Sequence, residues 1–401
     1  MNKLTGRQAV IRISLLIAVT YFVSYLTRIN FGAVILEMVR STGFEKSSLS
    51  AAITGAFITY GASQLVSGWC GDHMQPRTLI LAGLLASSLL NFLIPFCSTP
   101  AVMTAVWCVN GVAQAFLWPP LVRLMACLFS GEDYRRATVW VHWGASCGTI
   151  LLYLLSPLLI FLGGWQLVFR FSAVSGIAMA LVWFRSPLRV DAPASETPAA
   201  KTTVSSLLLT PLMLALILII ISVGALRDGV TTWMPTYIGE TYRLGSGTAI
   251  LTGVVMPLFG IVCQQIASLL YRRWPSPPLA SLLISVVSVA SALMILLAAG
   301  RSTAFSVLGA AALTGSMYGM NMILIGLLPS YFRNTGSVST ISGILNACVY
   351  IGSALSTYGF ARLSEAVGWN AVALLWLGLS AACALLCLLC VPAWKRRFPQ
   401  S

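Results

Sequence analysis

The amino-acid sequence predicts an all-α membrane protein in which twelve transmembrane helices form two pseudo-symmetric six-helix bundles. Composition is the first reason, because 58% of the 401 residues are hydrophobic and only 8% are charged, against about 25% charged in a soluble domain. Apolar stretches of about 20 residues, the length that crosses a bilayer, recur along the whole chain. A polar stretch near the midpoint separates two sets of them.

The apolar stretches give twelve predicted spans, at 11–38, 48–70, 78–97, 101–129, 136–162, 166–184, 206–236, 247–271, 279–299, 303–331, 338–364 and 370–391. The start of the chain is basic but has no small-residue cleavage site, so we expect the first span to act as an uncleaved insertion signal. The polar stretch is rich in proline and has the composition of a flexible linker. The predicted domains are an N-terminal bundle at 1–185, a cytoplasmic linker at 186–205 and a C-terminal bundle at 206–401.

The net charge of +14 is a topology signal. With the N-terminus inside, one set of loops and tails holds fifteen of the Lys and Arg residues, and the other set holds only Arg40, Lys46, Arg243 and Arg301. This asymmetry predicts a multi-pass protein of the plasma (inner) membrane with both termini in the cytoplasm. No nucleic-acid partner is expected, and the bilayer is the expected surroundings.

A guanidinium stands in the middle of the first span. Tyr21, Tyr25 and Arg28 lie at i, i+4 and i+7, so two phenols and a fixed charge share one helix face. An unpaired charge at bilayer depth costs at least about 2.5–3.5 kcal/mol, so Arg28 should face protein or water. It is either a structural arginine paired inside the bundle or part of an anion site.

The second half repeats this arrangement. A shift of 199 residues lays Arg28 on Arg227, and it also lays Gly61 on Gly260. Internal duplication suits two bundles around a central midplane site that is exposed alternately to the two sides. The arginine pair therefore favours the anion site, because two planar guanidiniums can bind a dianion bidentately.

Several spans also carry polar stripes at helical spacing. These are Tyr60 with Gln64, then Asn110 with Gln114 and Trp118, and Asn346 with Tyr350. Trp140 and His142 lie in the fifth span, where the polar residues do not all share one face. Any single stripe is explained by side chains that bond neighbouring helices. Stripes in several spans together favour a wet central cavity.

The loop Gly68-Trp69-Cys70-Gly71-Asp72, followed by Arg77, joins the second and third spans. It resembles the signature loop of the major facilitator superfamily. We expect Asp72 to cap a helix start or to pair with a basic residue of a neighbouring helix, as a latch that opens when the halves rock. An ordinary capped turn is the alternative.

A narrower resemblance covers most of the chain. The motifs that carry it are Tyr21-x3-Tyr25-Leu26-x-Arg28, Tyr60-Gly61, Trp118-Pro119-Pro120, Leu226-Arg227-x-Gly229-x3-Trp233 and Tyr318-Gly319. They are similar to the organophosphate:phosphate antiporters, which include the glycerol-3-phosphate and hexose-phosphate transporters. The resemblance implies that Arg28 and Arg227 hold the phosphate. The expected substrate-binding residues are Arg28, Arg227, Tyr21, Tyr25, Tyr60, Gln64, Trp118, Trp140, His142, Tyr318 and Tyr350, and the expected gating residues are Gly68, Asp72, Arg77 and Asp228.

The sequence departs from that family at several positions. Ile29 and Gln64 stand where the phosphate transporters have lysines, Gly144 replaces a histidine and Gly224 replaces a tyrosine. Asp228 stands beside Arg227 as an internal counter-ion. These departures suit a less charged anion, such as a carboxylate, or a larger phosphorylated one.

We therefore expect a secondary transporter of a small organic anion, of the organophosphate or sugar-phosphate class, that exchanges it for inorganic phosphate as counter-substrate. The alternatives are a proton-coupled carboxylate transporter that uses Asp228 or His142, and a membrane receptor for a phosphosugar. An enzyme is not expected, because ten acids and two histidines form no nucleophile–base set and no carboxylate cluster for a metal. No cofactor is expected, and the architecture is complete as a monomer.

Overall fold

The computed structural model describes residues 6–186, 208–243, 246–335 and 337–398. These residues form helices and turns, with no strand among them, which confirms the all-α prediction. They group into two compact units. One comprises the described residues within Met1–Ala200 and Pro329–Ala347, and the other those within Lys201–Leu328 and Cys348–Ser401.

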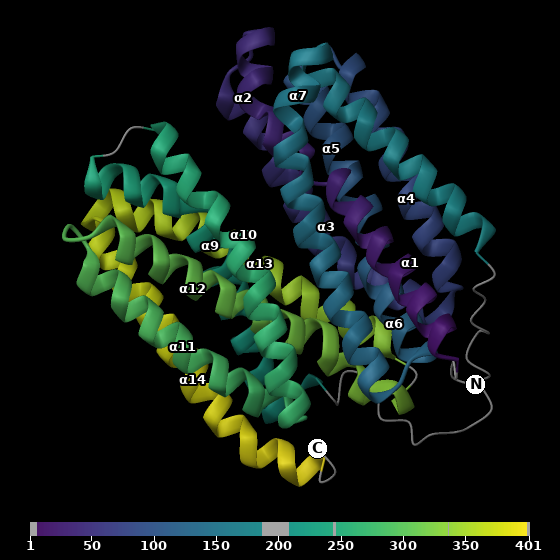
Figure 1. The fold of residues 1–401 in the computed structure, drawn as a ribbon, viewed down its shortest axis with the longest axis vertical. Coiled ribbons are helices and arrows are strands. Elements are labelled where there is room, and N and C mark those ends of the chain that lie inside the picture. The colour runs from purple at the N-terminus through teal and green to yellow at the C-terminus, as the bar shows by residue number, and fades with distance from the viewer. Residues whose placement is uncertain (1–5, 187–207, 244–245, 336, 399–401) are drawn as a thin grey trace. The chain divides into compact units, whose positions relative to one another are not determined.

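The first unit is a bundle of long helices with two main packing contacts, one between α1 and α7 and one between α3 and α5. The first predicted span packs against the fifth and sixth, and the second packs against the fourth, as Figure 1 shows in purple and blue. Its helices are α1 (Arg7–Leu26), α2 (Asn30–Thr42), α3 (Lys46–His73), α4 (Pro76–Leu93), η1 (Ile94–Phe96), α5 (Pro100–Ala115), α6 (Trp118–Leu128) and α7 (Gly131–Arg185).

Two of the six predicted spans in this unit are interrupted, and two others are joined in one long helix. The first divides into α1 and α2 around residues 27–29, and the fourth divides into α5 and α6 just before Trp118. α7 contains two predicted spans, which meet where Gly163 and Gly164 leave helical geometry, Gly164 with a φ of +70°. A positive φ costs glycine little, so the chain changes direction there.

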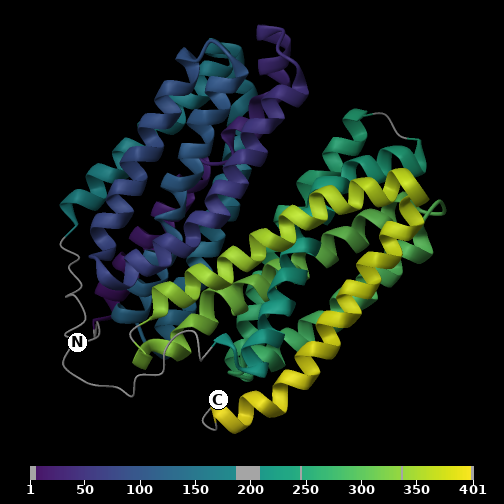
Figure 2. The same cartoon turned by 180° about the vertical axis from the view of Figure 1, so that it is seen from behind.

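The second unit arranges its helices around α9 and α12. α9 packs on α10, α12 and α14, while α11 packs on α12 and α14, and Figure 2 shows α14 in yellow along this unit. Its elements are α9 (Pro211–Tyr242), α10 (Ser246–Arg273), α11 (Pro277–Ala298), α12 (Thr303–Asn321), the π-helix η2 (Met322–Leu327), the 3-10 helix η3 (Leu328–Thr335), α13 (Val338–Val367) and α14 (Trp369–Arg397). η3 from Pro329 onward and the first turns of α13, up to Ala347, belong to the first unit.

Ten stretches of the described chain are long and apolar enough to cross a membrane. One of them, Gly131–Arg185, contains two predicted spans, and α3 covers the remaining predicted one. The helices therefore account for the twelve predicted spans. The predicted linker 186–205 lies outside the described residues except for Ser186, so the boundary between the halves stays a prediction.

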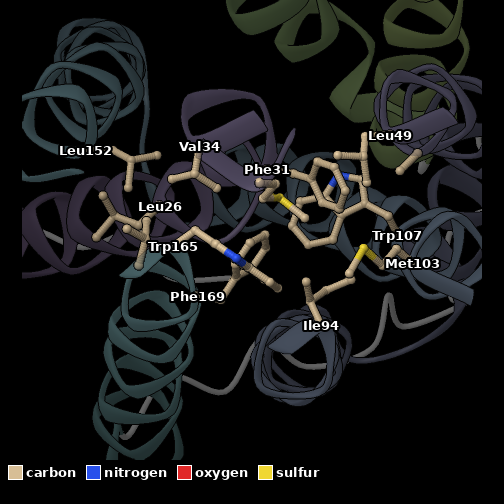
Figure 3. Packing of buried hydrophobic residues seen from close by; sticks show 13 residues of the cluster. Leu26, Phe31, Val34, Leu49, Ile94, Met103, Trp107, Leu152, Trp165 and Phe169 are labelled. Atoms are coloured by element: carbon tan, nitrogen blue, oxygen red, sulfur yellow. The ribbon is translucent and has the colours of Figure 1, made fainter. Parts of the chain in front are cut away.

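An aromatic cluster fixes α2 within the first unit. Phe31 is fully buried, with its ring centroid 5.2 Å from that of Trp107 and 5.8 Å from that of Phe169. Trp165 reaches the same cluster through Phe169, and Figure 3 shows these rings between the helices, with Leu26 and Val34 nearby. Because lipid is as apolar as these side chains, close van der Waals packing between the rings holds the helices together here. The cluster holds the chain rigidly just beyond the interruption that follows Leu26.

Candidate anion-binding site

Arg28 lies in a break of the first predicted span. α1 ends at Leu26 and α2 begins at Asn30, so the expectation of one continuous helix through Arg28 is wrong. The amides of Arg28 and Ile29 both donate to the carbonyl of Tyr25, at 3.2 and 3.1 Å. A tight turn therefore presents the guanidinium from the middle of the span.

A buried polar network supports this break. The carbonyl oxygen of Thr27 accepts hydrogen bonds from the side-chain amides of Asn91, at 2.8 Å, and Asn110, at 3.1 Å. The amide of Gln114 donates to the hydroxyls of Thr27, at 2.8 Å, and Ser87, at 2.7 Å. Within a bilayer, carbonyls that leave the helix ladder need such partners. We expected Asn110 and Gln114 to favour a wet cavity, but they are 1% and 3% exposed. Asn110 binds the backbone carbonyl of Thr27 and Gln114 binds its hydroxyl, beside Arg28.

The guanidinium of Arg28 lies against tyrosine rings. Its central carbon is 3.8 Å from the ring centroid of Tyr60 on α3 and 5.6 Å from that of Tyr25. Cation–π contacts orient a guanidinium without supplying a counter-charge. Three predicted site residues, Tyr25, Arg28 and Tyr60, thus come together in the first unit.

The same cluster continues away from Arg28. The ring of Tyr21 packs on Tyr25, at 5.4 Å between centroids, and on Trp118, at 5.0 Å. His142 stands edge-on to Trp118 at 5.3 Å, and its Nδ1 bonds the carbonyl of Thr138 at 2.9 Å. Helices α1, α6 and α7 thus bring together residues that are more than a hundred positions apart in the sequence.

Gln64 and Trp140 are placed differently. Gln64 lies one turn after Tyr60 on α3, is 0% exposed, and has no hydrogen-bond partner for its side-chain amide among the described residues. Trp140 is half-buried on α7 and makes no ring contact with the aromatic cluster in the described part of the chain. Both stay predicted site residues.

The second unit carries Arg227 on the unbroken helix α9. Its Nε and Nη2 donate to the two carboxylate oxygens of Asp228, at 2.6 and 2.8 Å. Its Nη1 donates to the side-chain oxygen of Asn321 on α12, at 3.0 Å, and the ring of Tyr318 lies 5.8 Å away. The predicted counter-ion is therefore fully engaged, with both oxygens on one guanidinium.

Asp228 is also held from α13. The hydroxyl of Ser353 donates to its Oδ2 at 2.5 Å, and Tyr350 on the same helix interacts electrostatically with Arg227. The second half-site thus contains the predicted Arg227, Asp228, Tyr318 and Tyr350, with no net charge on the ion pair. Asn321 and Ser353 were not predicted as partners, although Ser353 continues the stripe of Asn346 and Tyr350 at helical spacing.

The profile of the Major Facilitator Superfamily matches residues 17–357. The chain belongs to this superfamily. A protein of Chlamydia muridarum described as a probable hexose phosphate transport protein is 25% identical over 94% of this chain and 89% of its own length. The membrane sensor protein UhpC of Salmonella typhimurium is 24% identical over 87% of this chain and 84% of its own length.

A solved structure agrees on the fold. The fucose:proton symporter FucP of E. coli superposes with a TM-score of 0.74 over 95% of this chain and 99% of its own, at 13% identity. The predicted superfamily and the resemblance to organophosphate transporters are confirmed by these relatives. As a member of a superfamily of transporters, the chain is not an enzyme.

The superfamily's signature loop meets the first turn of α13 within the first unit. The carboxylate of Asp72 accepts the amides of Ser339, at 2.9 Å, and Thr340, at 2.6 Å. It therefore caps the amino end of α13, where a negative charge is stabilising. A Cβ on Gly68 would lie 2.9 Å from the carbonyl oxygen of Ser339, and one on Gly71 would collide with the Ser339 hydroxyl, so the glycines permit this approach.

A basic residue of a neighbouring helix completes the loop. Arg123 on α6 donates to the carbonyl of Gly71, and its Nε lies 3.9 Å from the carboxylate of Asp72. Burial raises the pKa of the Asp72 carboxyl, which lies beyond the apolar span 48–70. The hydrogen bonds from Thr340 and Ser339 and the positive charge of Arg123 oppose that shift. Sequence reasoning missed Arg123, although an arginine among apolar residues of α6 was a visible signal.

Arg77 serves the loop's other side. Its guanidinium donates to the carbonyl of Phe184 at 2.5 Å, and its own carbonyl accepts the indole of Trp183 at 3.0 Å. Arg77 therefore ties the start of α4 to the end of α7. In the described structure it contacts neither Asp72 nor α13.

Close packing accounts for two departures from the organophosphate transporters. A Cβ on Gly144 would collide with the carbonyl of Ala18 on α1, and one on Gly224 would collide with the carbonyl of Val349 on α13. Side chains as large as histidine or tyrosine cannot stand there without moving a helix. In this chain the close approach of the neighbouring helices thus requires glycine at both positions.

Proposed function

We propose that this chain is a secondary transporter for a small phosphorylated organic anion of the sugar-phosphate class, which it exchanges for inorganic phosphate by alternating access. Arg28 carries the proposal. It stands at a break at the middle of the first span, held by a buried network and faced by tyrosines. Such a group binds an oxyanion bidentately, while tyrosine hydroxyls donate to the remaining oxygens. The relative named as a hexose phosphate transport protein supports the class of substrate.

The proposal assigns binding of the anionic group to Arg28 and Arg227, with the tyrosines around each arginine as neutral donors. We further propose that the chain works as a monomer in the plasma membrane, with both termini in the cytoplasm as the distribution of Lys and Arg indicates. Asp72 and Arg123 then form the latch of the cytoplasmic face.

A phosphosugar receptor is the second candidate function. It is favoured by the relative named as a membrane sensor protein, which matches 87% of the chain, compared with 94% for the relative named as a hexose phosphate transport protein. A receptor binds its ligand but carries no flux. A proton-coupled carboxylate transporter is the third candidate. A carboxylate carries one negative charge, so its site needs fewer positive charges than the site of a phosphate dianion.

The test is uptake of labelled phosphate and of labelled glucose 6-phosphate into proteoliposomes preloaded with phosphate. We expect influx that requires internal phosphate and falls roughly tenfold to a hundredfold in Arg28→Gln, since a hydrogen bond to a charged group contributes about 1.5–3 kcal/mol. Arg28→Lys keeps the charge and loses the planar fork, so it should lie between the two. Arg170→Gln, an exposed arginine of α7, is the matched control.

Binding of glucose 6-phosphate without flux would support the receptor. Flux of carboxylates in empty vesicles, driven by a pH gradient, would support proton coupling. Unchanged exchange in Arg28→Gln would remove the arginine site altogether.

A further inference from the structure

We infer that Asp228 is a proton-binding site linked to the anion site, so that an anion binds at Arg227 only together with a proton on Asp228. The inference rests on the proposed function and deepens it by naming a coupled ion. It starts from the geometry of the Arg227–Asp228 pair, which both occupies the guanidinium and neutralises it.

The position of Asp228 in the sequence makes its role unusual. It is an acid deep inside an apolar span, and none of α10, α11, α12, η2 or α14 contains an acid or a histidine. An ionisable residue at this depth is costly and marks a functional site by default. Glu240, the other acid of α9, lies exposed near the end of that helix and accepts the indole of Trp369 at 2.7 Å.

Competition for Arg227 follows from the contacts. Arg227 has five N–H donors, of which Asp228 accepts one from Nε and one from Nη2, and Asn321 accepts one from Nη1. An oxyanion that binds bidentately along the Nε–Nη2 edge must therefore displace the carboxylate of Asp228 from that edge. The displaced carboxylate would then stand at bilayer depth beside a second anion, which two like charges cannot do at low cost. Taking up a proton from water removes that repulsion, and the anion gains both bonds to Arg227.

The surroundings allow this exchange of partners. The side chain of Asp228 is 31% exposed while that of Arg227 is 12% exposed, so water reaches the acid more easily than the base. The groups that face the pair from α12 and α13 include the phenols of Tyr318 and Tyr350. Ser353 donates to the carboxylate and its hydroxyl oxygen can accept from the protonated form.

The step is balanced in charge and atoms. Before binding, Arg227⁺ and Asp228⁻ sum to zero, and after binding Arg227⁺ faces the anion while Asp228 carries one added proton from solvent. Each anion that crosses therefore brings a proton with it. Exchange of like anions then moves no net protons, whereas net uptake becomes coupled to the pH gradient.

The first test needs no ligand. In Arg227→Gln the positive charge that pairs with Asp228 is gone while the hydroxyl of Ser353 remains, and we expect the infrared carbonyl band of a protonated carboxyl at pH 7. That band should be absent from the wild-type chain and from the double variant Arg227→Gln/Asp228→Asn. Its absence from Arg227→Gln, in protein that remains monodisperse in detergent, would overturn the inference.

The second test measures protons taken up when glucose 6-phosphate is added to the purified chain at pH 8, where the phosphate group is already a dianion. Linkage predicts about one proton per bound anion in the wild type and in the control Glu240→Gln, and none in Asp228→Asn. Equal uptake in Asp228→Asn would place the proton elsewhere and refute the inference. If the infrared band is found but glucose 6-phosphate does not bind, the proposed substrate class fails while the proton site stands.

Discussion

At the scale of single residues, Arg28 is held in position by the amide side chains of Asn91 on α4 and Asn110 on α5, which bond the backbone of the preceding residue, Thr27. Asn110 donates to the Thr27 carbonyl and accepts the Ser87 hydroxyl at 2.7 Å, so both ends of its amide are used. These two bonds position a residue that Asn110 itself does not touch.

We expect Asn110→Ala to lower the free energy of unfolding by about 1–3 kcal/mol, because it leaves a buried carbonyl and a buried hydroxyl each short of a partner. The same substitution should lower the transport rate at low substrate concentration by a larger factor than it lowers the yield of purified protein. Thermal unfolding in detergent and uptake kinetics are the measurements. The exposed Asn370→Ala should stay within about 0.5 kcal/mol of wild type, and equal behaviour of the two variants would contradict the network.

The sequence contained the charged members of the site but not their support. Arg28 and Arg227 are visible because charge is rare in apolar spans, and the tyrosines follow from helical spacing. The break after Leu26 carries neither proline nor glycine at residues 27–29, so no local signal announced it. It depends on Asn91 and Asn110, which lie far away in sequence, and tertiary contacts of this kind are invisible to periodicity.

At the scale of helices, the contact between α3 and the start of α13 depends on the absence of a side chain at Gly71. We expect Gly71→Ala to destabilise the protein by about 1–3 kcal/mol through overpacking against Ser339. The double variant Gly71→Ala/Ser339→Gly removes the colliding atoms and should recover most of that loss. Thermal midpoints of the two variants and of Ser339→Gly alone give the coupling energy.

A double variant no more stable than Gly71→Ala would mean that the helices do not approach as closely as described. The cap would remain, since Asp72 binds backbone amides that Ser339→Gly retains. For this reason the double variant tests packing separately from the capping charge.

Hydropathy predicted which stretches form helices, but it did not predict where those helices are interrupted. The twelve spans are each represented by a helix, because about 20 apolar residues have few other stable arrangements in lipid. The π-turn at Met322–Leu327 and the division before Trp118 change the hydrogen-bond register without changing composition. Pro119 and Pro120 fit the start of α6, where proline is tolerated, and so gave a partial signal.

At the scale of the whole molecule, the charge asymmetry predicts an orientation. We expect alkaline phosphatase fused after Ser401 to be inactive and a fluorescent protein at the same place to be bright, since the basic side of a membrane protein faces the cytoplasm. Alkaline phosphatase inserted at the turn of Gly300 and Arg301 should be active. The reverse pattern would invert the topology and with it the assigned face of the Asp72 latch.

The two halves are related in sequence but have diverged in chemistry. The first presents Arg28 to tyrosines at a helix break, whereas the second keeps Arg227 paired on a continuous helix. Sequence comparison of the halves located both arginines and the adjacent acid. It could not show that both carboxylate oxygens of Asp228 accept hydrogen bonds from Arg227, because adjacent residues on an ideal helix point in different directions.

The packing at Gly144 and Gly224 also limits how the selectivity of this chain can be redesigned. Restoring an imidazole or a phenol at either position requires a second, compensating change in the helix that faces it, so the effects of such substitutions will not add. A laboratory search that accepts one substitution at a time would find these positions closed. Such a search would have to begin with substitutions at Ile29 and Gln64, the other two departures from the phosphate transporters. The order in which substitutions are introduced would then decide which substrate selectivities can be reached.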